Sequence, residues 1–186
     1  MASTRLRVAG GTARGLPLTE PRGVRLRPTS GMLREAIFNI IGDRVEGALV
    51  LDLYAGTGAL GIEALSRGAA RAVFIEAEPA ACHAILQSLS RAGFNDRAEV
   101  LRGRLPSAIS RLQTAFDLIL MDPPYSLETA EETLGLLAPR LLAGGTIVYE
   151  HGSRYNPPER PAGLHLAERR VYGDSAIALY AAEEEK

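Results

Sequence analysis

The chain has 186 residues, of which 46% are hydrophobic and 23% are charged, and its formal net charge is −1. These values exclude a disordered chain and predict one globular domain with a sizeable core. The single cysteine, Cys82, excludes an internal disulfide and fits a reducing, cytoplasmic compartment. The apolar runs are only as long as strands, and the cysteine and histidines lack metal-ligand spacing. We therefore expect no membrane partner, no metal and a monomer.

Charge is unevenly distributed at the N-terminus. Residues 1–28 carry one acid, Glu20, against six arginines: Arg5, Arg7, Arg14, Arg22, Arg25 and Arg27. This glycine- and proline-rich segment is predicted to be a basic arm of extended chain or short strands, followed by the main domain at 29–186. Such an arm suits RNA phosphates, although a solvated surface tail has the same composition.

The next segments alternate between helix and strand patterns. Thr29 or Ser30 can cap a helix that runs to about residue 41. Strands are then predicted at 48–53, 71–76, 99–101, 116–121 and 146–150, and helices follow the first four of them, ending at about 67, 92, 112 and 141. Two final strands, 164–171 and 175–181, flank a turn at Gly173-Asp174. Repeated strand–helix units predict a doubly wound, mostly parallel sheet with an antiparallel hairpin at one edge.

A glycine loop follows the first strand and opens a helix. Gly56, Gly58 and Gly61 have the spacing of a dinucleotide-binding loop, and Glu76 ends the next strand about 20 residues later, where an acid can accept hydrogen bonds from ribose. The loop alone indicates an adenosine-containing cofactor and leaves NAD open. Asp52, four residues before the first glycine, favours S-adenosylmethionine, because a carboxylate pairs with its ammonium group and repels the pyrophosphate of NAD. A carboxylate that only orders the loop would look the same.

The tetrapeptide Asp122-Pro123-Pro124-Tyr125 follows the fourth strand of the alternation. Its two prolines stiffen the backbone and remove two N–H donors, which leaves the Asp122 carboxylate and main-chain carbonyls as acceptors beside an aromatic ring. That set suits a planar group bearing an NH2, with Tyr125 stacked on the ring. Hydrogen bonds from a nucleobase amine to these acceptors turn the nitrogen lone pair toward a methyl donor, so that positioning drives an in-line transfer.

Sheet geometry brings the two motifs together. If the strand order is 3-2-1-4-5, the first and fourth strands are neighbours at the point where the order reverses, and ligands bind beyond the carboxyl ends of strands there. The glycine loop and the Asp122 tetrapeptide would then line one cleft.

Several segments together resemble a known family. Val8-Ala-Gly-Gly-Thr-Ala-Arg-Gly15 and Tyr172-Gly-Asp174 fit it, and the strongest likeness is carried in order by Arg27-Pro-Thr-Ser30, Leu33-Arg-Glu-Ala-Ile-Phe-Asn39, the segment 51–68 and Asp122-Pro-Pro-Tyr125. The chain resembles the bacterial 16S rRNA guanine-N2-methyltransferases of the RsmD type. The resemblance implies a Rossmann-like class I S-adenosylmethionine-dependent fold with seven strands in the order 3-2-1-4-5-7-6 and an N-terminal β-hairpin arm. It also implies methylation of the guanine usually numbered 966 in 16S rRNA, within the small subunit or its assembly intermediate.

The resemblance also implies roles for individual residues. The cofactor would be held by residues of the first two strand ends and by Asp122: Asp52, Tyr54, Ala55, Gly56, Gly58, Glu76 and Ala77. Catalysis would rest on Asp122, Pro123 and Tyr125. The RNA substrate would be bound by residues of the N-terminal segments and of the tetrapeptide: Arg7, Arg14, Arg27, Thr29, Arg34, Pro124 and Tyr125. Gly31-Met32, Glu78 and Arg104 depart from the family pattern. Because Arg104 stands where many relatives have an acid that meets the adenine amine, adenine recognition is expected to use backbone groups.

Three alternatives remain. An adenine-N6 methyltransferase acting on DNA or RNA would use the same tetrapeptide, although this length leaves little room for a DNA-recognition domain. An NAD-dependent oxidoreductase would need a catalytic Tyr-Lys or His–acid set, and the only lysine is Lys186. A catalytically silent RNA-binding factor could use the fold without the chemistry.

Overall fold

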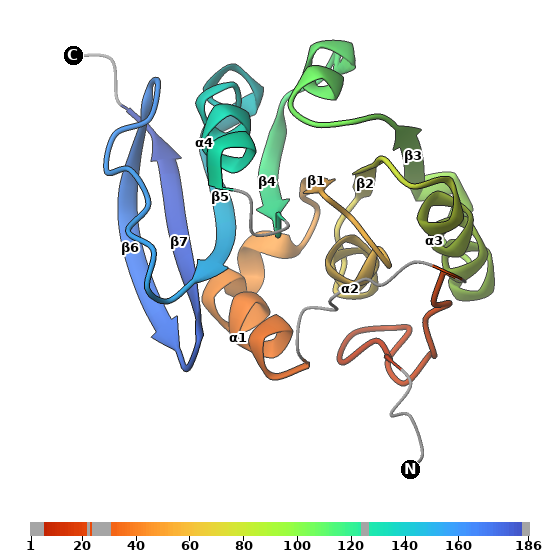
Figure 1. The fold of residues 1–186 in the computed structure, drawn as a ribbon. Helices are drawn as coiled ribbons and strands as arrows, with labels where there is room; N and C mark the ends of the chain where they lie inside the picture. The colour runs from red at the N-terminus through yellow and green to blue at the C-terminus, as the bar shows by residue number, and fades with distance from the viewer. Residues whose placement is uncertain (1–5, 22, 24–30, 124–126, 184–186) are drawn as a thin grey trace.

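The computed structural model describes residues 6–21, 23, 31–123 and 127–183. These residues contain a seven-stranded sheet in the order β3-β2-β1-β4-β5-β7-β6 (Figure 1). Its strands are β1 Leu49–Leu53, β2 Arg71–Glu76, β3 Ala98–Arg102, β4 Phe116–Met121, β5 Leu141–Gly152, β6 Leu164–Tyr172 and β7 Ser175–Ala182. The five strands from β3 to β5 are parallel, and β7 runs antiparallel between β5 and β6. The predicted strand order and mixed sheet are confirmed.

Helices cover both faces of this sheet. The α-helices are α1 Gly31–Ile41, α2 Ala59–Ser66, α3 Pro79–Ala92 and α4 Leu127–Gly135, and the 3-10 helices are η1 Gly42–Val45, η2 Asn95–Arg97, η3 Ser107–Arg111 and η4 Ala138–Arg140. In Figure 1, α1, α2 and α3 lie on one side of the sheet, and α4 lies on the other. Each side has its own core, because alternate residues of a strand point to opposite faces.

Two predicted elements were wrong in kind or length. Within the segment 105–112 the structure has the 3-10 helix η3 at Ser107–Arg111 in place of an α-helix, and runs this short are typical of 3-10 helices. The helix predicted to run to residue 141 ends at Gly135, and β5 starts already at Leu141. Gly135, a residue of low helix propensity, is the last residue of the helix, and Pro139 then favours the short turn η4.

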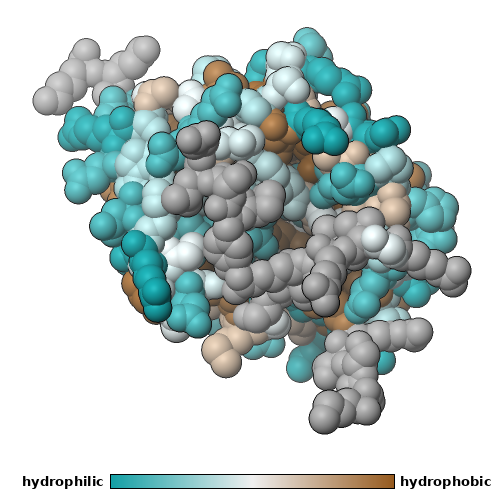
Figure 2. Space-filling model, in the orientation of Figure 1, coloured by the Kyte–Doolittle hydropathy of each residue, from teal (hydrophilic) through white to brown (hydrophobic). Residues whose placement is uncertain are grey.

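The described part of the N-terminal arm is a small hairpin packed against the domain. Hydrogen bonds between Val8 and Leu16 and between Leu18 and Leu6 join its two sides, with an isolated bridge between Arg7 and Pro17. Val8 and Leu18 are buried in the core that α1, α2 and α3 share. The face shown in Figure 2 is mostly hydrophilic in its described part. No helix among the described residues is both long and apolar enough to cross a bilayer.

Candidate functional site

The glycine loop makes a tight path from β1 into α2. Gly56 and Gly58 both have positive φ angles, of 55° and 73°. A Cβ on Gly58 would lie 3.0 Å from Ile85 Cγ1, and one on Gly61 would lie 2.3 Å from Phe74 Cε1. The first two glycines therefore serve the turn, and Gly61 allows α2 to pack closely on β2. This is the backbone arrangement that a cofactor-binding loop requires.

Asp52 lies under this loop. Its carboxylate accepts a hydrogen bond from the Gly61 N–H at 2.8 Å, and the residue is 2% exposed. Burial raises the pKa of Asp52 well above its ordinary value, the charges of Asp122 and Glu76 raise it further, and the Gly61 hydrogen bond opposes this rise. Asp52 thus orders the loop in this structure, and its carboxyl group lies within electrostatic reach of Asp122 and Glu76 at the strand ends.

Glu76 connects the ends of β1 and β2. One carboxylate oxygen accepts the Gly56 N–H at 2.7 Å, and the other accepts the N–H groups of Ala77 at 2.7 Å and Glu78 at 2.8 Å. Ala55 adds a main-chain hydrogen bond, of 3.1 Å, to the carbonyl of Ile75. The loop after β1 is therefore held in shape by the acid that ends β2. Carboxylate oxygens have further lone pairs, so ribose hydroxyls could join this network.

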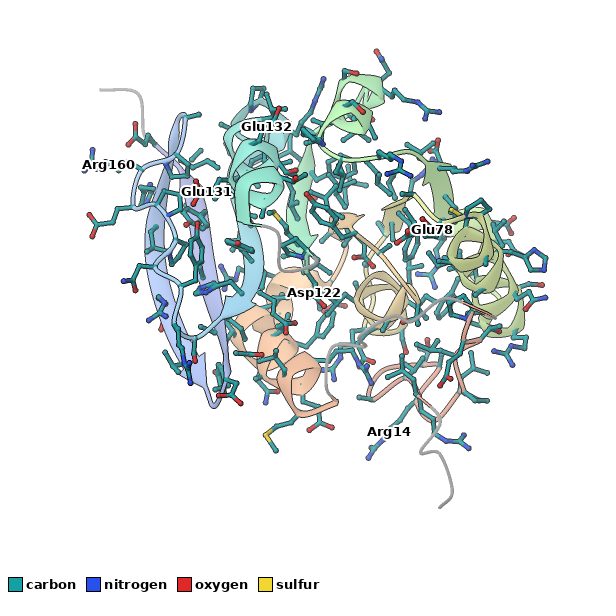
Figure 3. The ribbon with its side chains drawn as sticks, in the orientation of Figure 1. Arg14, Glu78, Asp122, Glu131, Glu132 and Arg160 are labelled. Atoms are coloured by element: carbon teal, nitrogen blue, oxygen red, sulfur yellow. The ribbon has the colours of Figure 1, made fainter. Side chains whose placement is uncertain are left out.

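Asp122 follows β4, the strand next to β1. Leu53, the last residue of β1, pairs with Met121, the last residue of β4, so Asp122 follows directly at the same edge of the sheet. Asp122 and Pro123 are both half-buried, and Figure 3 shows Asp122 in the middle of the molecule, between α1 and α2 in this view. The electrostatic effect of Asp122 on the buried Asp52 agrees with this proximity. Pro124 and Tyr125 lie outside the described residues.

Tyr54 turns away from the glycine loop. Its backbone has a positive φ of 56°, and its hydroxyl lies 2.7 Å from Thr133 Oγ1 on α4. Burial raises the pKa of Tyr54, while the hydrogen bond to Thr133 lowers it. The backbone of Tyr54 therefore belongs to the loop, whereas its side chain anchors that loop to α4.

Of the residues predicted to bind RNA, Arg7 and Arg14 lie on the arm and are exposed. Arg7 donates a hydrogen bond to the Gly15 carbonyl at 2.7 Å, and the side chain of Arg14 points outward at the edge of the molecule (Figure 3). Arg27 and Thr29 lie outside the described residues.

Arg34 is buried, with 3% of its side chain exposed. It donates a hydrogen bond to the Arg7 carbonyl at 2.6 Å and lies 3.5 Å from the Glu63 carboxylate. Desolvation lowers the pKa of Arg34, and the charge of Glu63 raises it. In this structure Arg34 joins the arm to α1 and α2.

The sequence prediction missed Glu63, which is fully buried in α2. Its carboxylate accepts the N–H groups of Ala9 and Gly10, both at 2.7 Å, and pairs with Arg67 at 2.8 Å. Together with Ser66, whose hydroxyl accepts the Ala13 N–H, Glu63 holds the arm on α2. A lone acid within the apolar stretch 59–66 was the available signal, because burying a charge is costly unless it has partners.

The prediction also missed Glu150, near the end of β5. It follows the apolar run Ile147–Tyr149 as Glu76 follows the apolar residues of β2, so the same pattern was present in the sequence.

Metal-ligand clusters of three or more His, Cys, Asp or Glu residues do not occur in the described part of the chain.

The architecture and the strand-end site define the class of the protein, which is the Rossmann-like class I methyltransferase fold. Escherichia coli yhhF, a protein named as a methyltransferase, has a solved structure that matches with a TM-score of 0.85 and 31% identity. The match covers 97% of this chain and 99% of that one.

Sequence comparison identifies the family within this class. Residues 6–181 match the family described as "Conserved hypothetical protein 95". Ribosomal RNA small subunit methyltransferase D of Escherichia coli is 35% identical over 185 residues, covering 97% of this chain and 92% of that protein. Bacillus subtilis YlbH, named as an rRNA methyltransferase, is 34% identical over 180 residues, covering 94% of this chain and 98% of that one. The chain belongs to this family, as the resemblance predicted.

Proposed function

We propose that the protein transfers a methyl group from S-adenosylmethionine to the exocyclic N2 amine of a guanine in 16S rRNA of the small ribosomal subunit. The observation that carries this proposal is the position of Asp122, beyond the end of β4 and beside the glycine loop that follows β1. Family membership supports the rRNA substrate, since the Escherichia coli relative is named for methylation of small-subunit ribosomal RNA.

The residues at the strand ends fit a cationic adenosine cofactor. Asp52, Glu76 and Asp122 gather three carboxyl groups close enough that two of them raise the pKa of the third. A positively charged ligand would relieve this repulsion, whereas a pyrophosphate would increase it. The Asp52–Gly58 segment would hold the methionine part, and Glu76 and Ala77 would meet the ribose edge. When bound, S-adenosylmethionine supplies an electrophilic methyl group on sulfur.

The chain's own contribution is to hold the target amine. The Asp122 carboxylate and the neighbouring carbonyl would accept the two amine hydrogens, and Pro123 brings no competing N–H donor. This arrangement aims the nitrogen lone pair and raises the reactivity of a weak nucleophile by orientation. Tyr125 would stack on the base, and the arm arginines Arg7 and Arg14 would meet phosphates.

The test uses the purified protein with small subunits that lack the modification and with S-adenosylmethionine labelled in its methyl group. We expect label in the rRNA and N2-methylguanosine on nucleoside analysis. N6-methyladenosine would support the adenine alternative instead, and rRNA that remains unlabelled would refute the proposal.

A further inference from the structure

Glu150 lies in line with Asp122 on the next strand. Met121 of β4 pairs in parallel register with Tyr149 of β5, so the residues that follow them, Asp122 and Glu150, are at the same level of the sheet. Adjacent strands are about 4.8 Å apart. The carboxyl edge of the sheet therefore places two acids side by side where the substrate is expected.

The two side chains also share a face. Met121 and Tyr149 belong to the core on the α4 side, so the next residues point to the other face, which α1 and α2 cover. The effect of Asp122 on the pKa of Asp52, which contacts α2, agrees with this direction. Glu150 is 9% exposed, and the Ser175 hydroxyl of β7 lies 3.5 Å from its Oε1. The Ser175 hydroxyl of β7 thus contacts the Glu150 carboxylate on the face toward which the strand alternation also directs Asp122.

Two adjacent carboxylates match one edge of guanine. Guanine presents its N2 amine and its N1–H side by side, and both are hydrogen-bond donors. Adenine presents its N6 amine beside N1, which is an acceptor that a carboxylate repels. Asp122 alone could hold either the guanine N2 amine or the adenine N6 amine. A second acid beside it, Glu150, could accept a hydrogen bond only where the ring atom next to the amine is a donor, as N1–H of guanine is.

We propose that Glu150 is a specificity-determining residue that accepts the guanine N1–H while Asp122 holds the N2 amine. This inference rests on the proposed function, because it concerns the same base in the same site. It gives the chain a physical reason to methylate guanine rather than adenine that the tetrapeptide alone does not contain.

The test compares guanine with 2-aminopurine, which keeps the 2-amine but has an acceptor at N1. Small subunits reconstituted with either base at the target position are methylated with the wild-type protein and with Glu150→Gln. We expect the wild type to prefer guanine in kcat/KM by at least about 100-fold, since a site built for a donor strongly rejects an analogue without it. Gln can donate to the N1 of 2-aminopurine, so Glu150→Gln should reduce this preference by about 10-fold or more.

The control is Glu46→Gln, an exposed acid at the amino end of β1, which should keep the wild-type preference. A wild type that methylates 2-aminopurine as well as guanine would overturn the role of Glu150 without any variant. An unchanged preference in a folded Glu150→Gln variant would overturn it too. In both cases the formation of N2-methylguanosine would leave the proposed function standing, whereas its absence in the wild type would refute that function itself.

Discussion

The acids at the carboxyl edge of the sheet differ in how they are held. Asp52 is buried and bound to the start of α2, Glu76 accepts three main-chain N–H groups, and Asp122 is half-buried. Burial without full compensation disfavours the charged form of a carboxyl group, and neighbouring negative charges add to this effect. The site therefore gathers carboxyl groups whose ionisation a bound cation would favour and a bound anion would oppose, which suits a cation more than an anion.

Removing the carboxylate of Asp122 should affect the reaction more than cofactor binding. We expect Asp122→Ala to lower kcat by about 100-fold or more, the size of effect seen when one positioned polar group is lost from an active site. Cofactor affinity, measured by calorimetry, should change by less than about 10-fold. Glu132→Ala, at an exposed acid on α4, is the control. Unchanged kcat in the Asp122 variant would contradict its catalytic assignment.

Asp52 should make stability depend on pH in the ligand-free protein. Its folded-state pKa is raised, so the folded state holds the proton more tightly than the unfolded state does. The stabilisation is complete below the ordinary carboxyl pKa and is lost as pH rises from that value through the raised one. Asp52→Asn should flatten this part of the pH profile, measured as the free energy of unfolding in urea at about pH 4 to 8.

The same Asp52→Asn variant should bind S-adenosylmethionine at least about 10-fold more weakly, because an amide cannot ionise in response to the positively charged cofactor as the Asp52 carboxyl group can. Asp96→Asn, at an exposed acid in η2, should keep both the pH profile and the affinity of the wild type. A pH profile that Asp52→Asn leaves unchanged would show that another group causes it.

At the scale of elements, local sequence predicted most of the sheet. β2, α3 and β4 have the predicted bounds, because apolar periodicity and flanking glycines or prolines define them locally. The region from α4 to β5 was less predictable. Its helical sequence pattern continues past Gly135, the last residue of α4. The start of β5 became clear only from the pairing of Leu141 with Phe116 of β4 in the structure.

The candidate site was predictable to a similar degree. Strand ends and glycines located the loop and Asp122, since their positions follow from the order of the sheet. The partners of Tyr54, Arg34 and Glu63 were not predictable, because each contact joins segments far apart in sequence. A buried ion pair in particular depends on which apolar surfaces close around it.

The pairing of the arm with α2 should be important for stability. In Glu63→Gln the buried Arg34 would lose its charged partner, and the amide would present N–H groups toward the donors of Ala9 and Gly10. We expect the free energy of unfolding to fall by about 3 kcal/mol. Urea unfolding provides the measurement.

Glu99→Gln is the matched control for this variant. Glu99 also pairs with an arginine, Arg71, but both side chains are about half exposed, so its loss should cost less than about 1 kcal/mol. Equal losses in the two variants would contradict a structural role for the buried pair.

At the scale of the whole molecule, the described part of the basic arm, residues 6–21, is packed against the domain. Deleting it would remove Val8 and Leu18 from the core, so a truncated protein would lose stability as well as any RNA contact. Substituting an exposed arginine of the arm removes a possible RNA contact but leaves Val8 and Leu18 in the core, so it tests RNA binding without the loss of stability. Within residues 6–21, Arg7 and Arg14 are therefore exposed on a folded hairpin.

Arg14→Ala should weaken binding to the unmodified small subunit and reduce its salt dependence. Each arginine–phosphate contact releases counterions, so the slope of log affinity against log salt should become shallower by about one. The dissociation constant would be measured between about 50 and 200 mM potassium chloride. Arg160→Ala, at the other edge of the molecule where Arg160 pairs with Glu183, should leave the slope unchanged. The same change in both variants would argue against a specific docking role for the arm.

The short helix α2 has a consequence for how ligands could influence each other. Its first residue follows the glycine loop at Gly58, and its far end carries Glu63 and Ser66, which hold the arm. Eight residues of helix span only about 12 Å, and all eight are buried, so we expect α2 to move as one rigid unit. If cofactor binding moves α2, the affinity for RNA will change with it. RNA must then alter the affinity for the cofactor by the same factor, because the linkage between two binding equilibria is reciprocal.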